Sequence, residues 1–154
     1  RIFSNIVPAE KAVSDTIGTM AFHESIDSGY SGAGNPGKAV KRNYNVATIT
    51  VDSMNLKKLN VLKIDAEGAE TEVINGAINT IKKLKPFILC EINEAGTLAP
   101  LERINVITSL GYTPYIFTRA GVAKFEKYHM FNYNILFIPN ESIDYFDTMF
   151  NIKK

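Results

Sequence analysis

The sequence is poor in the residues that build disulfides and most transition-metal centres. It has one cysteine, Cys90, two histidines and no tryptophan in 154 residues. A disulfide framework is therefore excluded, as is a zinc site made of clustered cysteines and histidines. We expect no bound metal.

The chain also lacks an excess of charge of either sign and any long apolar run. Its 17 lysines and arginines are balanced by 16 aspartates and glutamates, which leaves a formal net charge of +1 and no electrostatic reason to expect nucleic acid as a partner. No stretch approaches the roughly 20 apolar residues that span a bilayer, and no signal-peptide pattern is present. We therefore expect a cytoplasmic protein without a membrane span. With 45% hydrophobic residues, residues 1–154 are predicted to form one domain, or part of one.

The first third of the chain has short runs of β character at residues 12–13, 19–22 and 46–51. Between the last two lies a segment, residues 27–37, that is rich in glycine and includes Pro36. This composition predicts a surface loop. The loop can be a simple linker or a lid over an active site.

Residues 61–92 show the alternation of a strand, a helix and a second strand. Residues 61–65 and 87–92 are short apolar runs, each typical of a strand buried on both faces. Between them, apolar residues recur at helical spacing over 69–84, and Pro86 ends the pattern. This order predicts two adjacent parallel strands with a right-handed helical crossover on one face of the sheet.

The C-terminal half continues the α/β pattern and then changes. Pro100 is placed to begin a second amphipathic helix, and Gly111 to end it. Residues 112–117 and 133–138 then form two apolar runs with no helical pattern between them. They predict an antiparallel hairpin at the edge of a sheet that is otherwise mostly parallel.

Acidic residues follow both strands of the predicted crossover. Asp65 and Glu67 come after the first strand, and Glu91 and Glu94 lie at the end of the second, with Asn93 between them. Because parallel strands end at the same edge, these side chains should share one crevice. Such a group can orient a hydroxyl, take its proton or hold a divalent cation. Glu67 and Glu94 fit solvated loop acids equally well.

Four ordered motifs resemble the signature of the FkbM family of S-adenosylmethionine-dependent methyltransferases, over residues 7–93. They are AVSD at 12–15 followed by Gly18, the segment 46–54, KIDAEGAE at 63–70 with VINGA at 73–77, and PFILCE at 86–91. The resemblance implies a Rossmann-like methyltransferase sheet and S-adenosylmethionine as the cofactor. It also implies O-methylation of a hydroxyl on a sugar or secondary metabolite, so the partner would be a small-molecule or glycan acceptor.

The resemblance also implies roles for particular residues. Asp65 would orient or deprotonate the acceptor hydroxyl, with Glu67 beside it and Glu91 as a further acceptor contact. Ser14 and Asp15 would bind the methyl donor, together with Asp65.

An alternative base is His129, which lies in an aromatic-rich stretch, although a surface or packing role suits it better. A metal-dependent hydrolase built on Asp65, Glu67 and Glu91 is disfavoured, because no histidine is near them in sequence.

The sequence departs from the family pattern at the donor site. The family holds the donor with a glycine-rich turn after its first strand and an acid after its second, and neither is found before the AVSD motif. We therefore expect the chain to begin near the third strand of the family's sheet, to bind the donor weakly by itself and to be inactive alone. Unpaired sheet edges would favour a homo-oligomer. The alternative is a binding or assembly domain that keeps the scaffold without methyl transfer.

Overall fold

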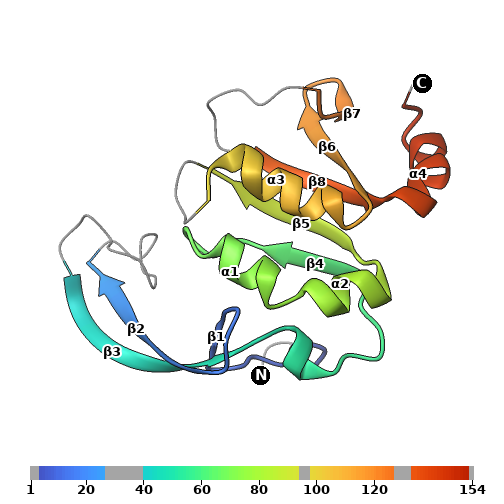
Figure 1. Cartoon of the computed structure of the whole chain (residues 1–154). Helices are drawn as coiled ribbons and strands as arrows, with labels where there is room; N and C mark the ends of the chain where they lie inside the picture. The colour runs from blue at the N-terminus through green and yellow to red at the C-terminus, as the bar shows by residue number, and fades with distance from the viewer. Residues whose placement is uncertain (1–3, 27–39, 94–97, 127–132, 153–154) are drawn as a thin grey trace.

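The computed structural model describes residues 4–26, 40–93, 98–126 and 133–152. Over these residues the chain has a mixed α/β fold with two sheets, one of three strands and one of five (Figure 1). None of the helices among them is long and apolar enough to cross a membrane. The glycine-rich segment 27–37, Glu94 and His129 lie outside the described residues.

The smaller sheet is formed by the N-terminal third of the chain. It contains β1 (Ala12–Val13), β2 (Gly18–Ser25) and β3 (Val40–Ile49) in the order β1-β3-β2. Strand β1 is parallel to β3, whereas β2 is antiparallel to it. In Figure 1, β2 and β3 form a long curved ribbon that extends away from the helices. The three predicted β runs are thus confirmed, with longer bounds for the last two.

The larger sheet is mixed rather than mostly parallel. Its order is β4-β5-β8-β6-β7, and the strands are β4 (Val61–Ile64), β5 (Phe87–Ile92), β6 (Tyr112–Thr118), β7 (Gly121–Lys124) and β8 (Tyr133–Pro139). The predicted parallel pair is confirmed, since Val61 pairs with Phe87 and Ile64 with Cys90. The other three pairings are antiparallel.

The two strands predicted to form a C-terminal hairpin, β6 and β8, pair antiparallel as predicted, but their predicted position at the sheet edge was wrong. Strand β8 lies between β5 and β6, and β7 forms the edge. A tight turn reached through Gly121, whose φ is +122°, pairs β7 with the outer side of β6. The inner side is therefore free for β8, whose Ile135 and Phe137 are fully buried, as expected for a central strand.

The predicted single helix over 69–84 is two helices, α1 (Glu70–Asn75) and α2 (Ile78–Leu84). The backbone turns at Gly76, whose carbonyl accepts a hydrogen bond from the Asp52 amide at 2.9 Å. A side chain at Gly76 would overlap the carbonyl oxygen of Ser14, so the β1 end approaches closely there. Docking of the N-terminal segment therefore divides a helical pattern that is continuous in sequence.

A second group of contacts starts α2. Asp52 belongs to a short 3₁₀ turn, η2 (Asp52–Met54), and its carboxylate accepts the backbone amides of Asn79 at 3.1 Å and Thr80 at 2.7 Å. These are first-turn amides that the helix itself cannot satisfy. Asp52 thus acts as an N-terminal cap supplied from outside the helix.

The two faces of the larger sheet are covered by different helices. Helices α1, α2 and α3 (Pro100–Ser109) lie over one face (Figure 1), where Ile88, Cys90 and Phe137 join the main core. Helix α4 (Ile143–Met149), which was not predicted, packs with Phe146 on the opposite side against Tyr115. The predicted start of α3 at Pro100 is confirmed, and Gly111 has the expected positive φ of +87°.

Candidate functional site

Three acidic side chains meet at the carboxyl end of the β4–β5 pair. Asp65 directly follows β4, Glu91 is the penultimate residue of β5, and Glu67 lies in the turn after Asp65. Carboxylate oxygens from the three residues lie within 4.8 Å of one another. We call Asp65, Glu67 and Glu91 the acidic cluster. The structure therefore brings together the three residues that the sequence proposed as catalytic.

The pKa of Glu91 reflects this crowding. Burial raises the pKa of the Glu91 carboxyl above its usual 4.5, and the negative charges of Asp65 and Glu67 raise it further. Glu70 adds a smaller effect in the same direction, while Lys63 opposes it. Glu91 therefore holds its proton to a higher pH than an ordinary glutamate, which suits a group that receives a proton during a reaction.

Two neighbours contact the acidic cluster at its rim. Lys63, which precedes it on β4, forms an ion pair with Asp65, and both side chains are about half exposed, at 54% and 44%. The Asn93 side-chain amide donates to Glu91 Oε2 at 3.3 Å. A single ammonium group thus offsets part of the negative charge of three carboxylates.

The cluster lies where β4 and β5 end, and two pockets lined by described residues lie elsewhere in the fold. One pocket is bounded by η2, the residues after it and α2, and includes Asp52 and Lys83. Another lies beside α4 and includes Asp144 and Asp147. Three carboxylates at the observed spacing offer oxygen ligands of the kind that hard divalent cations take. Exposed acidic groups with such spacing also occur without any ion.

Below the cluster lies a buried acid that the sequence analysis did not select. Glu70 begins α1 and is 0% exposed. Its Oε1 accepts the Ala66 amide at 2.9 Å, and both oxygens lie 3.2 Å from the Gly68 amide. Arg103 of α3, also 0% exposed, donates to Glu70 Oε2 at 3.2 Å and to the carbonyl oxygen of Asn93. A sequence signal was available, because Glu70 closes the KIDAEGAE motif.

Ser14 and Asp15 lie at the other end of α1. The Ser14 amide donates to the Ile49 carbonyl at 2.9 Å, and its hydroxyl donates to Asp15 Oδ1 at 3.2 Å. Its carbonyl faces Gly76, which follows α1. The six residues of α1, about 9 Å of helix, separate this point from the turn that carries Glu67. The structure does not join the two proposed donor residues to the acidic cluster.

These features define an α/β protein with carboxylates gathered where parallel strands end, the usual place for a ligand in such folds. Residues 6–114 match the model of the methyltransferase FkbM domain, which confirms the resemblance noted in the sequence. The chain belongs to the FkbM methyltransferase family. No curated protein and no solved structure matches it.

Proposed function

We propose that the chain serves S-adenosylmethionine-dependent O-methylation, and that the acidic cluster is where the acceptor hydroxyl binds. The acceptor class is a sugar or secondary metabolite that carries a free hydroxyl. The observation that carries this proposal is the convergence of Asp65, Glu67 and Glu91 in a chain of this family. Carboxylates are suitable acceptors for a hydroxyl proton and can also fix the direction of the oxygen lone pairs.

The environments of the three acids suggest different roles. The raised pKa of Glu91, caused by burial and by its acidic neighbours, makes Glu91 a suitable proton acceptor. Asp65 is more exposed and is paired with Lys63, so it is suited to orient the hydroxyl. Glu67 adds negative charge that helps Glu91 to keep a transferred proton.

The described residues fit the methyl donor in part. When bound, S-adenosylmethionine supplies a methyl group on a positively charged sulfur. The negative potential of the acidic cluster suits a cation near the acceptor. The exposed carboxylate of Asp15 can accept hydrogen bonds from a ribose, whereas the amide and hydroxyl of Ser14 are already used within the chain. We therefore assign Asp15 to donor binding and Ser14 to holding the β1 end in place.

The larger sheet is consistent with part of a Rossmann-like sheet. The parallel β4–β5 pair and its helical crossover have the arrangement that such sheets repeat. Among the described strands, β4 has a neighbour on one side only, and Val61 is 59% exposed there. Further strands of a Rossmann-like sheet would pair at this edge, and so could a second copy of the chain.

The test is to replace Asp65 and measure turnover and donor affinity separately. In protein that transfers methyl groups, Asp65→Asn should lower kcat by roughly 100-fold, because the acceptor hydroxyl is no longer held in position, and should leave the donor Kd nearly unchanged. Glu141→Gln, at an exposed position on η3 (Asn140–Ser142), is the matched control. An equal loss in kcat and donor affinity would move Asp65 from the acceptor site to the donor site.

A binding or assembly domain without methyl transfer is the competing function. The free edge of β4 is the observation in its favour. Titration calorimetry with S-adenosylmethionine and light scattering separate the two functions. A stable dimer that neither binds the donor nor transfers methyl groups would support the assembly domain.

A further inference from the structure

The turn that carries Glu67 has a backbone conformation that needs support. Glu67 has a φ of +50° and Gly68 a φ of +99°, so two successive residues are left-handed. Residues other than glycine rarely adopt this backbone conformation, because their Cβ atom crowds the backbone. The Glu70 carboxylate accepts the amides of Ala66 and Gly68, on either side of Glu67. Glu70 therefore holds the turn in the shape that directs Glu67 toward the other acids.

Arg103 links this turn to the residue that follows β5. Its guanidinium donates from Nη1 to Glu70 and from Nη2 to the carbonyl oxygen of Asn93. Asn93 lies two residues after Glu91, whose carboxylate its side chain contacts. One planar group therefore joins the segment after β4, which carries Asp65 and Glu67, to the segment after β5. A guanidinium suits this purpose because its donors have a fixed geometry.

A contribution to stability does not by itself explain why Glu70 and Arg103 form a buried ion pair here. Both side chains are completely buried, and Arg103 Nε has no hydrogen-bond partner among the residues that the structure describes. Removing two charges from water is costly, and apolar residues of similar size are often as stabilising or more so. A buried ion pair at this position is better explained by the geometry that it imposes.

We propose that Glu70 and Arg103 are positioning residues, which set the separation of the acidic cluster by tying the two strand-end segments together below it. The effect on turnover rests on the proposed function, whereas the structural link does not. Both side chains are fully buried, and the pair contacts the backbone at residues 66, 68 and 93.

Two substitutions that keep the charges test the proposal. Glu70→Asp shortens the carboxylate by one methylene, and Arg103→Lys replaces the planar fork by a single ammonium group. The first readout is hydrogen exchange at the Ala66 and Gly68 amides, followed by NMR in the full chain. Exchange at these amides should become about tenfold faster or more in both variants, as expected for the loss of hydrogen bonds to a charged group.

The second readout separates positioning from folding. In protein that transfers methyl groups, both variants should lower kcat by roughly 100-fold with little change in the KM for the acceptor, because a shift of about 1 Å in reacting groups has effects of this size. The double variant should be no worse than the more affected single variant, since the two residues act as one unit.

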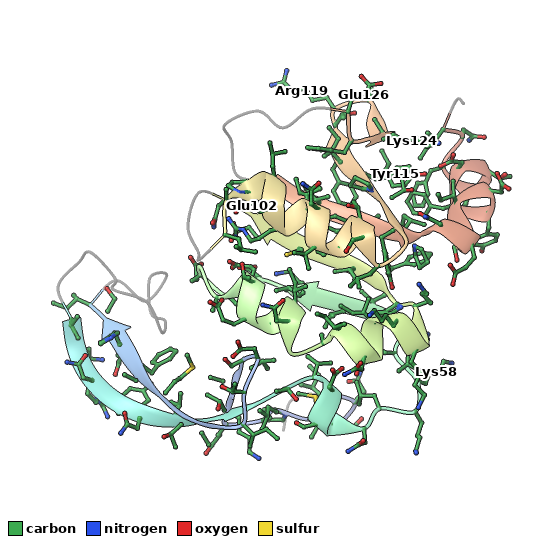
Figure 2. The ribbon with its side chains drawn as sticks, in the orientation of Figure 1. Lys58, Glu102, Tyr115, Arg119, Lys124 and Glu126 are labelled. Carbon is green, nitrogen blue, oxygen red and sulfur yellow. The ribbon has the colours of Figure 1, made fainter. Side chains whose placement is uncertain are left out.

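Tyr115→Phe is the control for a general loss of stability. Tyr115 lies near α4 (Figure 2), and its hydroxyl donates to Asp147 at 2.6 Å in a buried contact. The Tyr115→Phe variant should have a lower melting temperature, with unchanged hydrogen exchange at residues 66 and 68 and an unchanged kcat.

The proposal is overturned if folded Glu70→Asp and Arg103→Lys keep native exchange at both amides, or if Tyr115→Phe reproduces their effects. Should Glu70→Asp fail to fold, Arg103→Lys alone decides. Absence of methyl transfer in the unmodified protein would contradict the proposed function, while the exchange result would still decide the structural link.

Discussion

Asp52 and Glu91 are both partly buried carboxyl groups, yet their pKa values are shifted in opposite directions. Burial alone would raise the pKa of Asp52, but hydrogen bonds from Thr80 and Asn79 outweigh it and lower that pKa below 3.8. Burial raises the pKa of Glu91, and neighbouring carboxylates add to the effect. Asp52 accepts hydrogen bonds from Asn79 and Thr80, whereas most of the charged groups around Glu91 are carboxylates. The first arrangement stabilises a helix, and the second leaves carboxylate oxygens that a ligand can contact.

Glu70 links these two kinds of site. It is as well supplied with donors as Asp52, since it accepts two backbone amides and one guanidinium. It nevertheless lies directly below the acidic cluster and raises the pKa of Glu91. The comparison shows that a buried carboxylate with several hydrogen-bond donors can hold a group of mutually repelling acids in place.

The largest expected effect comes from removing the charged partner of Glu70. Arg103→Met should lower the free energy of unfolding by about 3–5 kcal/mol, because it leaves a buried charge without its partner. Chemical denaturation measures this change. Lys41→Met is the control, since Lys41 pairs with Glu24 at 2.7 Å on the surface and is 59% exposed, so its loss should lower stability far less. Equal costs for the two variants would contradict our account of Glu70.

The second prediction concerns the cap of α2. Asp52→Ala should lower the free energy of unfolding by about 0.5–2 kcal/mol, because the amides of Asn79 and Thr80 lose their acceptor. Asp52→Asn keeps one acceptor oxygen and should have a smaller effect. Because folding lowers the pKa of Asp52, its contribution is present above pH 3.8 and is lost as the pH falls through the folded value. If the stability of the unmodified protein and that of Asp52→Asn depend on pH in the same way, the Asp52 carboxylate is not the group that causes the loss of stability in acid.

The smallest effect should have the opposite sign. Folding raises the pKa of Glu91, so the folded state binds a proton more tightly, and stability falls as the pH rises from 4.5 through the folded value. Glu91→Gln removes the repulsion from Asp65 and Glu67 and should increase stability at neutral pH by up to about 1 kcal/mol. Chemical denaturation of Glu91→Gln at pH 4 and pH 8 checks this prediction, since the gain in stability should appear only at pH 8. A loss of stability at pH 8 would mean that Glu91 is held by favourable contacts.

Much of the acidic cluster could be predicted from the sequence. The apolar runs at 61–65 and 87–92, with a helical pattern between them, indicate a parallel pair, and a parallel pair brings Asp65 and Glu91 to one edge. Local pattern and chain direction are sufficient for this step. The motifs that indicate the family extend over residues 7–93, and the family is confirmed over residues 6–114. The assignment of roles to Ser14, Asp15 and the three acids remains a prediction.

Other features depend on contacts between residues far apart in the chain. Glu70 and Arg103 are 33 residues apart, and no local pattern indicates that one guanidinium will reach both Glu70 and the carbonyl of Asn93. The break in the predicted helix at Gly76 is set by Ser14 and Asp52, which come from the N-terminal segment.

The sequence by itself therefore determined the strand–helix–strand unit, the acids at its end and the family, because periodicity and motif spacing are local properties of the chain. The tertiary structure decided where β8 inserts, where the crossover helix breaks and which buried pair holds the acidic cluster. Each of these depends on which distant backbone and side-chain groups satisfy one another after the chain has folded, and burial makes that satisfaction obligatory.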